Sequence, residues 1–95
     1  MYYILTYELA DNYYEAREPV RQLHFNHIQP YLEKGEFLMG GALETAEEAV
    51  LIFKTANKAS VEEFVQKDPY VRSGVVTGWR IRKWNMVVGI TKNEE

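Results

Sequence analysis

The stretch "SVEEFVQKDPY", from Ser60 to Tyr70, decides the fold because it contains a short helix with both of its ends marked. Ser60 followed by Glu63 has the spacing of a capping box, which opens a helix over "VEEFVQK". Asp68-Pro69 closes it, since the residue before a proline avoids the helical region of backbone space. This helix follows three predicted strands and precedes a fourth, which fixes the order of elements.

The rest of the chain has the pattern of a split βαβ domain. The predicted elements are a strand over Tyr2–Leu9, a helix beginning near Tyr13 and regular from about Glu18 to Lys34, strands over Glu36–Leu43 and Ala49–Thr55, the short helix, a connecting loop "YVRSG", and a strand over Val75–Trp84. The order β-α-β-β-α-β predicts an α+β, ferredoxin-like domain, with two helices on one face of an antiparallel sheet. We assign residues 1–85 to this domain and residues 86–95 to a C-terminal tail that frays at its polar end.

Composition narrows the classes of protein that fit. The chain has 95 residues, 46% hydrophobic and 26% charged, as expected of one globular domain. A net charge of −3 without a basic stripe argues against nucleic acid. The absence of cysteine excludes disulfides and thiolate chemistry. The start "MYYILTYEL" lacks a basic leader region and is far shorter than a membrane span, so we expect a cytoplasmic protein without membrane contact.

The predicted strands are apolar on both faces. The first carries Tyr3, Leu5 and Tyr7 on one face and Tyr2 and Ile4 on the other. Two helices cover only one face of a sheet, and a large exposed apolar patch usually marks an interface. We therefore expect a homodimer formed sheet against sheet, which could assemble further.

One histidine occupies an apolar helix position. His24 is spaced by four residues from Val20 and from Ile28. It is either a packed histidine bonded to a backbone carbonyl or a general acid or base at the edge of an apolar pocket. A carboxylate that orients the ring must come from elsewhere in the chain. Asp68, at the end of the short helix, is the best candidate, because a carboxylate at a helix C-terminus needs a compensating donor or cation.

Two further groups are candidates for ligand contacts. Arg21 lies one turn before His24, and Arg17 one turn before Arg21; they form either a solvated cationic face or a clamp for an anionic substrate. Gly40 and Gly41 on the second strand mark a bulge or a close approach of backbone or ligand.

His27 follows His24 by three residues, a spacing that two metal ligands can have. Two ring nitrogens are too few for a metal site, and the neighbouring amides of Asn26 and Gln29 are weak ligands. We therefore interpret His27 as a packing or surface residue and expect no metal site.

These motifs together resemble the YciI-like family (YCII-related domain) of the dimeric α+β barrel superfamily. "RQLH" resembles the family's Arg-x-x-His, "LEKGEFLMGGAL" its helix end and second strand, "FVQKDPYVRSGVV" its Asp-Pro-Tyr signature, and "IRKW" its last strand. Ala42 stands where the family usually has proline. The resemblance implies a barrel dimer and a pocket where His24 and Asp68 meet, used in some members for acid–base chemistry on small ring compounds.

Two hypotheses follow. In the first, the protein is an enzyme that isomerises, eliminates from or dehalogenates a small ring compound. His24 is its acid and base and Asp68 orients the ring, while Arg21, Tyr70 and Gly41 contact the substrate, and no cofactor or metal is required. In the second, the chain is a non-catalytic dimeric module that binds a small ligand or a partner, with a structural His–Asp pair.

Overall fold

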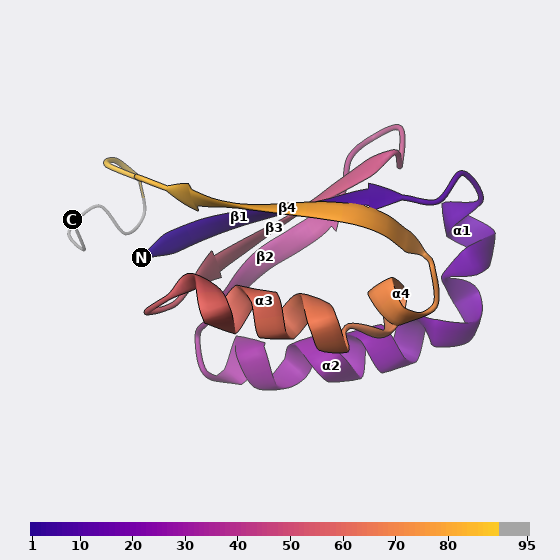
Figure 1. Cartoon of the computed structure of the whole chain (residues 1–95), viewed down its shortest axis with the longest axis horizontal. Helices are drawn as coiled ribbons and strands as arrows, with labels where there is room; N and C mark the ends of the chain where they lie inside the picture. The colour runs from indigo at the N-terminus through magenta and orange to yellow at the C-terminus, as the bar shows by residue number, and fades with distance from the viewer. Residues whose placement is uncertain (90–95) are drawn as a thin grey trace.

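A computed structural model describes residues 1–89 of the chain, shown in Figure 1. Its elements are β1 (Tyr2–Leu9), α1 (Tyr13–Ala16), the 3-10 turn η1 (Glu18–Val20), α2 (Arg21–Glu33), β2 (Phe37–Ala42), β3 (Glu48–Lys54), α3 (Lys58–Lys67), α4 (Pro69–Arg72) and β4 (Val76–Trp84). Within residues 1–89, no helix is both long enough and apolar enough to cross a membrane.

The four strands form one antiparallel sheet in the order β2-β3-β1-β4. The helices all lie on one side of it (Figure 1). This confirms the predicted ferredoxin-like α+β arrangement. Because β1 is central and pairs with both β3 and β4, a residue of β1 is held from both sides.

The first helical segment is divided as its proline predicts. α1 is a single turn beginning at Tyr13, η1 carries Pro19, and the regular helix α2 starts at Arg21 rather than near Glu18. Proline favours a first-turn position because it has no N–H to donate. After α2, Gly35 has a φ of +75°, the left-handed conformation of a residue that ends a helix.

Two local predictions around α3 are wrong. The helix begins at Lys58, capped by Asn57, whose side-chain oxygen accepts a hydrogen bond from the Ser60 backbone N–H at 3.2 Å. Asn57 lies three residues before the predicted cap, Ser60, and asparagine is as favourable as serine in this role. The "YVRSG" segment is not wholly a loop, because α4 occupies its first part, with Pro69 as the first helical residue and Asp68 as its cap.

The core lies between the sheet and the helices. The core-facing side chains of β1 pair across the sheet with those of β3, Tyr3 with Phe53 and Leu5 with Leu51. Phe64 of α3 packs edge-on against Phe53, with ring centroids 5.0 Å apart. Aromatic pairs of this geometry add to the burial of their area.

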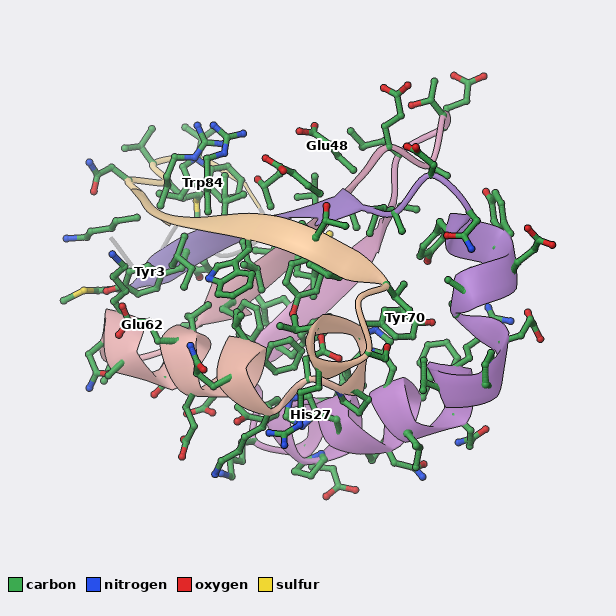
Figure 2. The ribbon with its side chains drawn as sticks, turned by 45° about the vertical axis from the view of Figure 1, so that its right-hand side comes forward. Tyr3, His27, Glu48, Glu62, Tyr70 and Trp84 are labelled. Carbon is green, nitrogen blue, oxygen red and sulfur yellow. The ribbon has the colours of Figure 1, made fainter. Side chains whose placement is uncertain are left out.

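The opposite face of the sheet carries no helix. Ile4 and Ile52 are paired on it, and Met39 and Trp84 are exposed there. Figure 2 shows Trp84 on the side of the sheet away from the helices. The prediction that β1 and β3 have apolar residues on both faces is thus confirmed, while β4 places Arg80 and Arg82 on the uncovered face.

The predicted C-terminal tail lies partly outside the described residues. Of residues 86–95, only 86–89 are described, and within them Met86 is buried while Val87 and Val88 are exposed. Residues 90–95, where we predicted fraying, are not described.

Candidate functional site

His24 and Asp68 meet in the interior. His24 lies on the buried face of α2 with Ile28, and its Nδ1 is 2.8 Å from Oδ1 of Asp68. The two residues are 44 positions apart in the chain, and the structure brings them together as the sequence predicted. The contact is therefore tertiary and depends on α2 lying beside α4.

The Asp68 carboxylate is fully buried and accepts three hydrogen bonds. Besides His24, the Tyr70 backbone N–H donates to Oδ1 at 3.0 Å and the Tyr7 hydroxyl donates to Oδ2 at 2.6 Å. We predicted a carboxylate at an unfavourable helix C-terminus. Instead Asp68 also opens α4, so that the N–H groups of the new helix face it. The compensating donors that the prediction required are these three.

Tyr7 is the site residue that sequence analysis missed. It is 1% exposed, and its hydroxyl reaches Asp68 from the middle of β1. Burial, then the charge of Asp68, then this hydrogen bond raise the Tyr7 pKa well above its ordinary value, so the phenol stays protonated and donates. The only signal in the sequence was a tyrosine at an inward-facing strand position, since a buried hydroxyl usually has a partner.

The hydrogen bonds to Asp68 fix the tautomer of His24. An ionised carboxylate accepts and cannot donate, so Nδ1 carries the proton and Nε2 keeps its lone pair. Within residues 1–89, no hydrogen bond occupies Nε2. The Tyr70 ring stacks on the imidazole, with centroids 3.7 Å apart and planes 7° from parallel. The ring is therefore held through Nδ1 and on one face, which leaves Nε2 as its nitrogen without a described partner.

A cavity of about 410 Å³ is lined in part by His24. This volume lies within the range of small-molecule sites, about 300–1,000 Å³. Its lining is largely aromatic and aliphatic. Apart from the tyrosines, its ionisable side chains are His24, Arg17 and Arg21. Among the described residues, no aspartate or glutamate lines it. A chain of net negative charge thus has a cavity with positive charge.

The predicted ligand-contacting residues all line this cavity. Arg21, Tyr70 and Gly41 are each part of its wall, and Arg17 is too. In Figure 2, Tyr70 points toward the end of the molecule occupied by α1. Burial raises the Tyr70 pKa to about 12, so its hydroxyl is also protonated at neutral pH.

Gly40 and Gly41 differ in the space that their surroundings leave for a side chain. A Cβ on Gly40 would lie 2.8 Å from the Phe37 ring, whereas a Cβ on Gly41 would meet nothing within 4 Å. The predicted close approach is therefore at Gly40, and the register of β2 shifts just before it, between Phe37 and Met39. Ala42, the residue that departs from the family pattern, also lines the cavity.

His27 has a packing role, as predicted. Its Nε2 is 2.8 Å from the Phe64 carbonyl oxygen, and its ring lies against the rings of Tyr31 and Phe64. His24 and His27 thus bond to different partners. In the described part of the chain, no three His, Cys, Asp or Glu side chains are grouped to hold a metal.

Comparison with known proteins gives a family and a fold. The YCII-related domain matches residues 1–85. No curated protein matches the sequence. A solved structure of 5-chloro-2-hydroxyhydroquinone dehydrochlorinase (TftG) from Burkholderia phenoliruptrix AC1100, in complex with 2,5-dihydroxybenzoquinone, has a TM-score of 0.73 and 17% identity, over 90% of this chain and 94% of that chain.

Two more distant structures have the same fold. A nipsnap family protein of unknown function (Atu4242) from Agrobacterium tumefaciens has a TM-score of 0.54 and 21% identity, over 85% of this chain and 82% of that one. A mutant of MhuD with two manganese protoporphyrin IX bound has a TM-score of 0.51 and 13% identity, over 94% and 96%. At these identities the similarity shows the fold of ferredoxin-like, dimeric α+β barrel proteins.

Proposed function

The chain belongs to the YCII-related domain family, and from this premise we propose that it is a small-molecule enzyme in which His24 transfers protons. The observation that supports this most directly is that the two nitrogens of the His24 ring have different surroundings. Nδ1 is bound to the buried Asp68 carboxylate at 2.8 Å, Nε2 has no hydrogen bond within residues 1–89, and His24 lines a cavity. A base must have a free lone pair within reach of substrate, and this ring has one.

The chemistry follows from these contacts. Nε2 accepts a proton from an acidic carbon of the substrate, and the ring becomes a cation. Asp68 stabilises that cation through the Nδ1–H bond, and the electron-rich face of Tyr70 lies against it. In an isomerisation the proton returns to a different carbon. In an elimination the C–H electron pair forms a new π bond while the leaving group, such as halide, departs with its bonding pair.

The cavity suits a small ring compound. Its apolar and aromatic lining covers a flat ring, and Arg21 on the same wall attracts an anionic group of the substrate. The similar dehydrochlorinase is named for a chlorinated hydroxyhydroquinone, and its structure contains a dihydroxybenzoquinone. Such a ring fits the acid–base chemistry proposed here, which needs no group beyond the side chains described.

The test is turnover by matched variants. Wild type, His24→Gln and Asp68→Asn are screened against small lactones and halogenated or hydroxylated aromatics, with His27→Gln as the control from the same helix. We expect turnover in wild type and in His27→Gln, and a fall of roughly a hundredfold or more in the other two, all with native circular dichroism. If folded wild type turns over none of these compounds while the His24 and Asp68 variants unfold, the pair is structural and the protein is a binding module.

We also propose that the chain forms a homodimer through the uncovered sheet face. This face carries Ile4 and Ile52 at its centre and the exposed Met39 and Trp84. Burying such side chains contributes about 25 cal/mol per Å² of apolar surface. A second copy presenting the same face is the simplest partner, because a two-fold axis pairs identical patches.

Sedimentation of two glutamate variants tests the dimer. Met39→Glu places a charge on the uncovered sheet face. Because Met39 is 62% exposed, this substitution does not alter the core. Leu23→Glu is the control, because Leu23 is 55% exposed on α2. We expect wild type and Leu23→Glu to sediment as dimers and Met39→Glu to shift toward monomer. A monomeric wild type, or two dimeric variants, would contradict this interface.

A further inference from the structure

Arg17 is the polar group of the cavity that the proposed mechanism does not use. Its Nε is buried and, within residues 1–89, has no hydrogen-bond partner. The nearest carboxylate oxygen, on Glu18, is 4.0 Å away, too far for a hydrogen bond. A buried donor without an acceptor is costly, and in native proteins such a group is expected to have a partner, such as a water, an ion or a ligand.

The Arg17 guanidinium is held in place by two aromatic rings. Its Cζ is 5.1 Å from the centre of the Tyr13 ring and 4.9 Å from that of Tyr14, and Nη1 donates to the Tyr13 hydroxyl at 3.3 Å. These contacts bind its faces and one of its N–H groups. A guanidinium fixed in this way loses little conformational freedom when an acceptor binds.

The second cation of the cavity lies one turn away. Arg21 also lines the cavity, and its Cζ is 5.2 Å from the centre of the Phe25 ring. No described carboxylate side chain lines the cavity, and Glu18, outside its lining, makes only the 4.0 Å ion pair with Arg17. His24 follows Arg21 by three residues, so their Cβ atoms are about 5–6 Å apart on one helix face. That spacing is about the width of one six-membered ring.

From this arrangement we infer that the substrate is a single-ring carboxylate, with Arg17 and Arg21 binding the carboxylate and the ring extending toward His24. Arg17 is the specificity-determining residue, because a carboxylate has the negative charge and the two acceptor oxygens that pair with a guanidinium, whereas a neutral ring compound has no such charge. The ring is then covered by Tyr70, which is already stacked on the imidazole. This inference rests on the proposed function for its orientation, but the carboxylate site itself involves no proton transfer.

The experiment compares benzoate with benzamide, which has the same ring and nearly the same shape without the charge. Binding to wild type, Arg17→Met and Arg17→Lys is measured by calorimetry, with Arg72→Met as the control because Arg72 is exposed and outside the cavity. We expect benzoate to bind wild type and Arg72→Met about tenfold or more tightly than benzamide. Arg17→Met abolishes this preference and leaves benzamide affinity unchanged, and Arg17→Lys, which keeps the charge but not the Nε–H, reduces it in part.

Equal binding of benzoate and benzamide to wild type would overturn the inference, as would an undiminished preference in folded Arg17→Met. Arg17→Lys keeps the test decisive if the methionine variant unfolds, because an unchanged preference there would also count against a role for Nε–H. Benzoate binding by His24→Gln separates the two proposals. If this variant keeps the benzoate preference while no ring compound is turned over by wild type, the carboxylate site stands and the enzyme does not.

Discussion

The hydrogen bond from Tyr7 to Asp68 gives the sharpest test of how this site is held together. Replacing Tyr7 by phenylalanine removes the hydroxyl and keeps the ring, which is 1% exposed in the core. The lost bond is 2.6 Å long and its acceptor is a fully buried carboxylate. A hydrogen bond to a charged group contributes about 1.5–3 kcal/mol, and its loss leaves one buried oxygen without this donor. We therefore expect the free energy of unfolding to fall by about 2–3 kcal/mol.

The same strand supplies a matched control. Tyr3 is buried on the same face of β1, and within residues 1–89 its hydroxyl makes only a 3.5 Å contact with the Met1 sulfur. Tyr3→Phe should therefore change the free energy of unfolding by less than about 1 kcal/mol. Urea unfolding of both variants at one protein concentration, followed by circular dichroism, gives the comparison. Equal losses in the two variants would refute the claim that Asp68 depends on Tyr7.

A double-mutant cycle then assigns the energy to the pair. In an Asp68→Asn background the charged acceptor is gone, so the additional cost of Tyr7→Phe should drop below that in wild type by about 1 kcal/mol or more. Additive losses would mean that the tyrosine stabilises the core by other contacts and the carboxylate only incidentally.

Two further predictions concern other parts of the cavity. Gly40→Ala should destabilise the protein by about 1–3 kcal/mol, because its Cβ would lie 2.8 Å from the Phe37 ring. Gly41→Ala should be neutral or stabilising, because its Cβ would meet nothing within 4 Å. Equal urea midpoints of the two variants would contradict this prediction. The raised pKa of Tyr70, about 12 in the folded chain against about 10 unfolded, means that the folded state holds this proton more tightly. Its contribution to stability is complete below about pH 10 and is lost as the pH rises toward 12, so Tyr70→Phe should lose less stability than wild type over that interval in urea unfolding.

The order of elements and the identity of the two central residues could be predicted from the sequence, because both depend on local signals. Strand alternation, a proline stop and glycine at a helix end determine where segments begin and end. A histidine at an apolar helix position and an aspartate before a proline are unusual enough to be noticed singly. The prediction failed where two local signals lay within a few residues of each other. At α3 the cap is Asn57 and not Ser60, and at α4 Pro69 begins a helical turn as well as ending α3.

The remaining features of the site were decided by tertiary packing. Nothing near Tyr7 in the chain indicates that its hydroxyl ends on an aspartate 61 residues away, because that contact exists only once β1 lies under α4. The same holds for the stacking of Tyr70 on His24 and for the unpaired Nε of Arg17. The sequence by itself determined where the helices and strands lie and which side chains can transfer protons or bind charge. The packing of α2 and α4 against the sheet determined which of those side chains meet, since distance in space is set by the closed core and not by position in the chain.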